Sequence, residues 1–158
     1  MRRCRPIRRP DKKKNDQKLS HMLLYISQVH WMEARHLHAA SVLPSAGLVI
    51  ARQYLPWAKL PTVGLSPLTT TEEIEHGLRS TTAKLTCTLE SPIRIPSRPV
   101  CFRLVCVDGT EWVLGTDSRP HPAVTQETAF ANRPSERSVC TLTATVSSGC
   151  QLLEYLRE

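Results

Sequence analysis

The strongest constraint on the fold is a hairpin signal in the second half of the chain. Residues 100–107 form a run rich in β-branched and aromatic side chains, Asp108-Gly109 follows, and residues 110–115 return to a strand pattern. A two-residue Asp-Gly connection is typical of a type I′ turn, because both of its central positions need a positive φ. Such a turn predicts these opposed pairs: Val107 with Thr110, Val105 with Trp112, and Arg103 with Leu114.

Strict alternation of apolar and polar side chains marks two further strands, at residues 84–90 and 139–146. Shorter strand patterns cover residues 47–55 and 150–156, the latter after a Ser148-Gly149 turn. With 12 Pro and only 5% aromatic residues, the composition favours short elements joined by turns. We therefore expect a mainly β fold, a small antiparallel β-sandwich or partly open barrel of six short strands, in a single domain over residues 44–158.

Two connections and the leading segment complete the predicted layout. Residues 117–138 contain three Pro and polar filler, which predicts an irregular loop. Three Thr before Glu72 favour one short helical turn that ends at Gly77. Residues 19–43 are interpreted as a helix on the three-to-four spacing of their apolar side chains, or as an extension foreign to the natural protein, since Met22 and Met32 are alternative starts.

The net charge of +7 is concentrated in the first 18 residues. This basic arm has nine Lys and Arg against two Asp, and the rest of the chain is balanced at twelve positive and twelve negative side chains. Because the arm is almost without apolar side chains, we expect it to be disordered. Its cations are the candidate nucleic-acid-binding residues, which would hold phosphates without sequence specificity. They are Arg2, Arg3, Arg5, Arg8, Arg9, Lys12, Lys13, Lys14 and Lys18.

The six cysteines and six histidines have no metal-binding spacing. Cys101 and Cys106 lie five residues apart on one predicted strand, so they should face opposite sides of the sheet. The thiols Cys87, Cys106, Cys140 and Cys150 are interpreted as small buried hydrophobic groups. The cluster His30, His36 and His38 lacks the spacing that a metal needs on a helix. We predict no metal and no cofactor.

No catalytic motif stands out either. The carboxylates Glu72, Glu73 and Glu75 lie beside His76, a combination used in general acid–base catalysis, but in a short polar turn we interpret them as solvated charges. The sequence has no Gly-x-Ser-x-Gly turn and no phosphate-binding glycine loop. With no signal peptide and no long apolar run, we expect a reduced protein that is cytoplasmic on synthesis and does not associate with membranes.

The β-rich part resembles small structural, tail-associated proteins of phages and prophages of Bacteroides-type bacteria. The similarity covers roughly residues 47–158. The segments that carry it are residues 51–57, residues 100–116, Arg119-Pro120-His121-Pro122, the Thr-alternating strand at 139–146, and Leu152-Leu153-Glu154-Tyr155-Leu156. The resemblance implies a component of virion or tail assembly, whose partners are other structural subunits or copies of itself.

Two functions from different classes follow. The first is a non-enzymatic structural subunit that binds other proteins, with exposed strand edges as the means of assembly. The alternative is a basic protein that associates with nucleic acid through its arm. An enzyme is the least favoured class, because it would need polar groups that converge in a pocket.

Overall fold

The computed structural model describes residues 17–132, 137–148 and 152–158, and these are mainly β-structure, as predicted. The strands are β1 (Gln17–Glu33), β2 (Ala40–Leu43), β3 (Leu48–Ala51), β4 (Ala58–Lys59), β5 (Ser66–Glu75), β6 (Leu78–Leu89), β7 (Val100–Cys106), β8 (Glu111–Leu114), β9 (Ala123–Ala129), β10 (Val139–Ser148) and β11 (Leu153–Arg157). Two short 3-10 helices, η1 (Ala34–Ala39) and η2 (Pro44–Ala46), flank β2. No helix within these ranges is long and apolar enough to cross a membrane.

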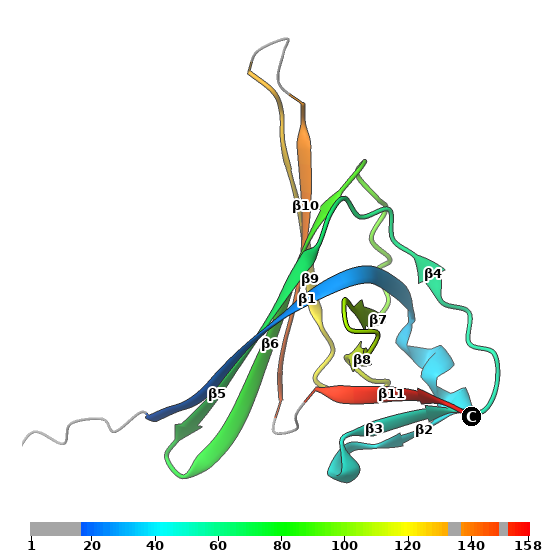
Figure 1. Cartoon of the computed structure of the whole chain (residues 1–158), viewed down its shortest axis with the longest axis vertical. Coiled ribbons are helices and arrows are strands. Elements are labelled where there is room, and N and C mark those ends of the chain that lie inside the picture. The colour runs from blue at the N-terminus through cyan, green and yellow to red at the C-terminus, as the bar shows by residue number, and fades with distance from the viewer. Residues whose placement is uncertain (1–16, 133–136, 149–151) are drawn as a thin grey trace, which may run out of the picture.

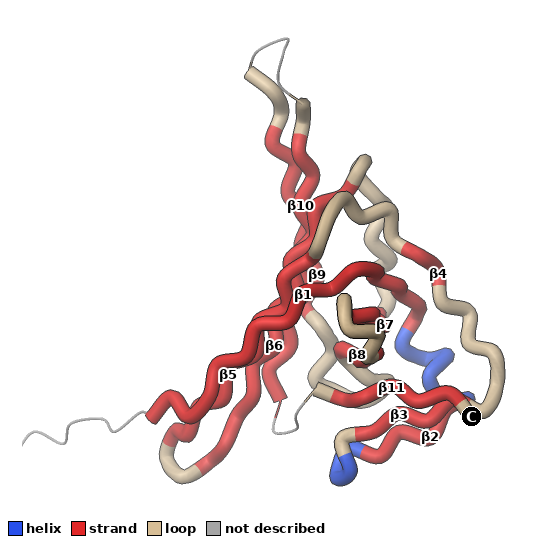
Figure 2. The backbone as a smooth tube through the Cα atoms, in the orientation of Figure 1, coloured by secondary structure: helices blue, strands red, loops and turns tan. Residues whose placement is uncertain are grey.

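All the strands belong to one open sheet, drawn in red in Figure 2. Its order is β2-β3-β11-β8-β7-β1-β5-β6-β10-β9, with β4 beside β1. Every pairing is antiparallel except that of β11 with β3, so the sheet is mixed. The eleven strands exceed the six that we predicted.

The sheet curls around a shared core. Leu85 on β6 and Leu142 on β10 belong to the same buried cluster as Phe102 on β7 and Leu114 on β8, although β1 and β5 separate the two pairs of strands in the sheet order. Burying these side chains from both halves of one sheet supplies the hydrophobic stabilisation that two packed layers normally provide. Of the two predicted architectures, this curled, unclosed sheet corresponds to the partly open barrel.

Strand β7 lies at the centre of the molecule and is buried on both faces. One face contributes Phe102 and Cys106 to the main core. The other contributes Cys101 to a second cluster that includes Met32, Leu37 and Val49. The prediction that Cys101 and Cys106 face opposite sides is confirmed.

The predicted helix at residues 19–43 is wrong. Residues 17–33 form β1, a central strand that pairs with β5 along its first half and with β7 along its second half. A register shift between Ile26 and Gln28 brings Ile26 and Val29 into the same core, and Met32 enters the core on the opposite face. A bulge and burial on two faces therefore produced the spacing of three that imitates a helix.

The short helical turn that we predicted to end at Gly77 is also wrong, because residues 66–75 form a strand. They form β5, which pairs with β1 on one side and β6 on the other, so its threonines extend a sheet instead of capping a helix. The turn that follows has positive φ at both His76 and Gly77, which is the geometry of a two-residue type I′ hairpin. The predicted loop at 117–138 is likewise corrected, because it contains strand β9, which pairs with β10.

The predicted β7–β8 hairpin exists, but its register is shifted by one residue. Phe102 opposes Leu114, and Leu104 opposes Trp112. Only Gly109 has a positive φ, and its N–H donates to the Cys106 carbonyl, so the connection is a type I turn that ends in a glycine bulge. Asp108 favours this form, because its carboxylate accepts hydrogen bonds from the Thr110 backbone N–H (2.9 Å) and hydroxyl (2.7 Å).

The alternating segments are confirmed as strands. In β6, the side chains of Leu85, Cys87 and Leu89 are buried, and in β10 those of Cys140 and Leu142 are buried. The strand predicted over 47–55 is shorter, since β3 ends at Ala51, and β11 overlaps the closing strand predicted over 150–156 but ends one residue later, at Arg157. Of the turn before β11, Gly149 and Cys150 lie outside the described residues.

Candidate functional site

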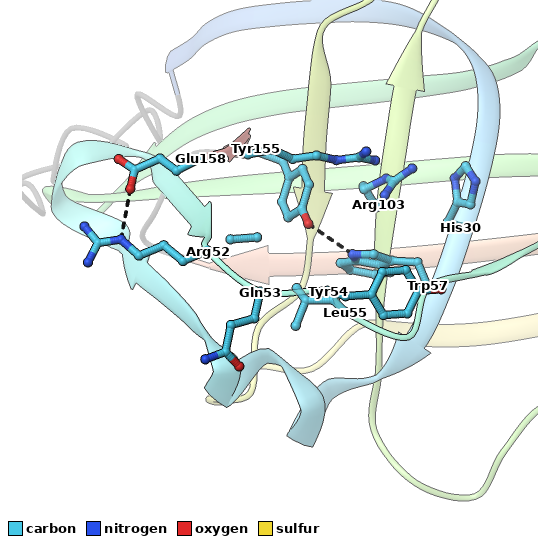
Figure 3. Close-up of a pocket in the computed structure, with 11 residues that line it drawn as sticks. His30, Arg52, Gln53, Tyr54, Leu55, Trp57, Arg103, Tyr155 and Glu158 are labelled. Carbon is cyan, nitrogen blue, oxygen red and sulfur yellow. Dashed lines mark hydrogen bonds and ion pairs between the residues drawn. The ribbon is translucent and has the colours of Figure 1, made fainter.

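A cleft of about 450 Å³ opens beside the C-terminal strand. Its walls come from β1, β7, β11 and the segment that leaves β3, as the labelled side chains in Figure 3 show. The lining residues are His30, Ala51, Arg52, Gln53, Tyr54, Leu55, Trp57, Arg103, Tyr155, Arg157 and Glu158. Three of the eleven are arginines and three are aromatic, which distinguishes this cleft from the apolar cores on either side of β7.

Arg103 is the central polar group of the cleft. Its side chain is only 11% exposed, because β7 is covered on both faces. The guanidinium carbon lies 5.9 Å from the ring centroid of Trp57 and 5.7 Å from that of Tyr155. The two rings meet edge to face at 6.0 Å, and the Trp57 indole N–H donates to the Tyr155 hydroxyl at 3.3 Å. These contacts hold Arg103 in place by cation–π attraction.

Two carboxylates pair with the arginines of the cleft. Glu111 lies behind it, 3.2 Å from Arg103 Nε and 3.8 Å from Arg157 Nη2. The Arg103 Nε–H is not aligned with that oxygen for a hydrogen bond, so the pair is purely electrostatic. At the rim, Glu158 accepts a hydrogen bond from Arg52 Nε at 2.9 Å. The charged side chains around the cleft are thus three guanidinium groups and two carboxylates.

His30 forms the inner wall of the cleft, directly opposite Arg103 in the β1–β7 ladder. Burial lowers the pKa of this imidazole to about 4, and the positive charges of Arg103, Lys59 and Arg157 contribute in the same direction. The ring is therefore neutral at physiological pH. Its buried Nδ1 has no hydrogen-bond partner in the described chain.

The stability of the protein should fall in acid because of His30. The unfolded state binds a proton near pH 6.5 and the folded state only near pH 4, so stability is fully present above pH 6.5 and declines as the pH falls towards about 4. We expect His30→Gln to flatten this decline in urea unfolding followed between pH 7 and pH 4. His36→Gln, on the exposed surface of η1, should keep the wild-type slope. An unchanged slope in His30→Gln would contradict the assignment.

The chemistry that this arrangement can perform is anion binding. Guanidinium groups stay protonated at all physiological pH values, so they donate hydrogen bonds and charge but do not exchange protons. The one imidazole present is a poor general base, because its pKa is far below neutrality.

A second surface of interest is the outer face of β5, β6, β10 and β9. Alternate residues of these strands point away from the core, and many of them are threonines, with Glu73, Lys84 and Glu127 as charged side chains among them. Across the sheet, Thr86, Thr143 and Thr125 lie side by side in one row. The threonines of this face are Thr69, Thr71, Thr82, Thr86, Thr88, Thr125, Thr141, Thr143 and Thr145.

This threonine face ends at β9, an edge of the sheet with β10 on one side and no described strand on the other. The β9–β10 hairpin projects away from the rest of the molecule at the top of Figure 1. The opposite edge, β2, has only four residues and is flanked by the two 3-10 helices. Among the described strands, β9 therefore forms the long unpaired edge at one end of the sheet, and the short β2 forms the other end.

The candidate residues of the basic arm fall almost entirely outside the described part of the chain. Lys18 alone lies within it, near the start of β1. The other eight, from Arg2 to Lys14, belong to residues 1–16. Lys18 and the cleft lie at opposite ends of β1, so the candidate residue that the structure describes does not join the arginines around Arg103.

The histidine and glutamate clusters are also separated. His30 is on β1 and not on a helix, whereas His36 and His38 are on η1. His38 pairs with Asp117 at 2.9 Å. Glu72 pairs with Arg79 across the β5–β6 hairpin. Within the described ranges, no group of three or more His, Cys, Asp or Glu side chains could hold a metal ion.

The described cysteines, Cys87, Cys101, Cys106 and Cys140, are free thiols in buried positions. Burial raises the pKa of Cys87 and of Cys106, and it raises the pKa of Cys101 to about 12. Buried thiols behave as small apolar groups, as predicted for Cys87, Cys106 and Cys140. Cys150 lies outside the described residues.

Sequence reasoning missed the cleft altogether. Its residues come from four separate segments, and none of them forms a local motif. One signal was present: Arg103 is the only charged residue in the apolar run at 100–106, where a buried cation needs a specific environment.

Comparisons with protein-family models, with curated proteins and with solved structures each gave no match to this chain.

Proposed function

We propose that the protein is a non-enzymatic structural subunit that binds other protein subunits by strand addition at β9. The observation that carries this proposal is the open edge of β9, seven residues long. An unpaired edge presents a row of backbone N–H and C=O groups to any extended chain that approaches it. Copies of the same chain are the first partner that we propose, because each copy carries the same open edge.

The sequence of β9 supports this role. Natural proteins protect exposed edges with Lys, Pro, bulges or very short strands. Residues 123–129 contain one charge, Glu127, and no Lys or Pro, and they pair with β10 without a register shift. The adjoining threonine face, in which Lys84 and Glu127 are charged, provides rows of threonines that an added strand could extend. The resemblance to structural proteins of phages and prophages suggests virion or tail assembly as the setting.

Two neighbouring proline substitutions test the proposal. In an antiparallel edge strand, successive residues direct their N–H groups alternately inwards and outwards, so one of Thr125 and Gln126 directs its N–H to the open edge. We expect the full chain to form oligomers, seen as rings or tubes by electron microscopy and as multiples of one chain mass by light scattering. The edge-directed member of Thr125→Pro and Gln126→Pro should abolish oligomers with little change in melting temperature. Its neighbour should lower the melting temperature, because it removes a hydrogen bond of the β9–β10 ladder.

A mass of one chain at every concentration would contradict self-assembly through β9. Oligomers that persist in both proline variants would place the interface elsewhere. Gln126→Pro also removes the hydrogen bond that the Ile93 backbone N–H donates to Gln126 Oε1 (3.1 Å), so its melting temperature is compared with that of Gln126→Ala.

A second candidate function is nucleic-acid binding through the basic arm. The observation that favours it is the confinement of the whole net charge of +7 to residues 1–18. Deletion of residues 1–16 removes eight of the nine candidate cations and leaves β1 whole. Under this alternative, binding of arbitrary DNA should weaken steeply with salt and disappear in the deletion variant. Unchanged binding after the deletion would exclude the arm as the site.

A further inference from the structure

The arginines of the cleft form a preorganised anion receptor. Arg103 is held between two aromatic rings with its side chain almost fully buried, and Glu111 engages only its Nε. Within the described chain, its two Nη groups donate no hydrogen bond, so they remain available to a ligand. Arg157 and Arg52 add two guanidinium groups from the neighbouring walls. Guanidinium forks match the oxygen geometry of phosphate and carboxylate groups.

The same cleft offers flat apolar surfaces next to these cations. Tyr54 is 91% exposed, so its aromatic ring is open to a ligand. Trp57 and Tyr155 line the cleft next to Arg103, and Tyr54 lines it from the same segment as Trp57 (Figure 3). Aromatic faces beside arginines are the surfaces on which nucleic-acid bases stack.

From this combination we infer that the cleft binds one nucleotide unit, with its phosphate on Arg103 and Arg157 and its base against Tyr54 and Trp57. The volume of about 450 Å³ lies in the lower part of the range for small-molecule sites, about 300–1,000 Å³, which favours a mononucleotide over a dinucleotide. The three guanidinium groups of the cleft favour a phosphate over a carboxylate as the bound anion, because a phosphate carries more negative charge and more acceptor oxygens.

This nucleotide has two sources with the same chemistry, a free mononucleotide and a residue of a single-stranded nucleic acid. The site shares no residue with the open edge at β9 or with the candidate residues of the basic arm. Failure of the nucleotide proposal would therefore leave the strand-addition proposal intact, and the reverse also holds.

Calorimetric titration of the full chain tests the proposal with adenosine monophosphate, adenosine, inorganic phosphate and a short single-stranded oligodeoxyadenylate. Adenosine monophosphate should bind at least about tenfold more tightly than adenosine or phosphate alone, because only the nucleotide uses both halves of the cleft. Arg157→Gln should weaken this binding by about tenfold or more, the usual effect of losing a hydrogen bond to a charged group.

Matched variants separate the cleft from general charge effects. Arg98→Gln is the control for Arg157→Gln, since each arginine pairs with a glutamate and each side chain is 59% exposed. Tyr25→Ala, on β1, is the control for Tyr54→Ala. Both controls keep the basic arm, so they should bind the nucleotide as the wild type does, whereas Tyr54→Ala should lose several-fold in affinity.

The affinity for the oligonucleotide distinguishes a single-stranded ligand from a free nucleotide. Tighter binding of the strand than of the mononucleotide, lost in Arg157→Gln, would support a single-stranded ligand, and equal affinities would support a free nucleotide. The inference would be overturned if adenosine monophosphate does not bind at millimolar concentration, or if Arg157→Gln and Arg98→Gln weaken binding equally.

Discussion

A chain that begins at Met32 should fail to fold, whereas a chain that lacks only residues 1–16 should melt at the temperature of the full protein. Starting at Met32 removes almost all of β1, which pairs with β4, β5 and β7. It also removes Ile26 and Val29, both fully buried in the main core. Burial of one such side chain contributes about 1.5–3 kcal/mol, and the exposed edges of β5 and β7 would lose their hydrogen-bond partners as well.

The loss should exceed the stability of the whole domain, which for a protein of this size is about 5–15 kcal/mol. Far-ultraviolet circular dichroism and thermal melting of the two truncated chains measure the result. Deletion of residues 1–16 is the control, because the arm has too few apolar side chains to contribute to a core. A cooperative melting transition in the chain that begins at Met32 would contradict this prediction, because it would show that the rest of the sheet folds without β1.

Gly115→Ala should destabilise the protein by about 2–4 kcal/mol, more than the same change at any other described glycine. Gly115 has a φ of 86°, a backbone conformation that an L residue adopts only at a cost of about 1–2 kcal/mol. A Cβ at this position would lie 2.6 Å from Cδ of Pro122 and closer still to its Cγ. Pro122 is buried and its ring is rigid, so the clash has to be relieved by moving the backbone between β8 and β9.

Gly109→Ala is the matched control for this prediction. Gly109 has a similar φ of 89°, but nothing lies within 4 Å of an added Cβ. Only the conformational cost remains, so we expect a loss of about 1–2 kcal/mol. Urea unfolding of both variants gives the two values. Equal losses would show that contact with Pro122 does not restrict position 115.

Local patterns were reliable where a strand has one buried and one exposed face. The alternation at 84–90 and 139–146 predicted β6 and β10, together with the side that each cysteine faces. Patterns failed where a strand is buried on both faces or contains a bulge. The helix over residues 19–43 was predicted from a three-to-four spacing that includes Leu23 and Ile26, but β1 has a bulge after Ile26 and buries Val29 and Met32 on opposite faces.

Turn chemistry was informative about position but not about register. Asp108-Gly109 marked the reversal between β7 and β8 correctly, yet the Asp108 side chain binds Thr110 and produces a longer loop with one positive φ. The His76-Gly77 turn has the two positive φ values expected at Asp108-Gly109, although its sequence is a weaker signal for them. Which turn forms depends on how the flanking strands pair with their other neighbours.

The sequence by itself determined the β class of this protein, the strands β6, β7, β8 and β10, and the concentration of charge in its first 18 residues, because these properties depend on neighbouring side chains and composition. Only the tertiary structure decided that residues 17–33 form a central strand, that β9 is an open edge, and that Arg103, Trp57 and Tyr155 meet in one cleft. The cleft, for example, depends on contacts between residues far apart in the chain, 46 positions for Arg103 and Trp57 and 98 positions for Trp57 and Tyr155. No local pattern records such contacts, since the curling of the whole sheet brings them about.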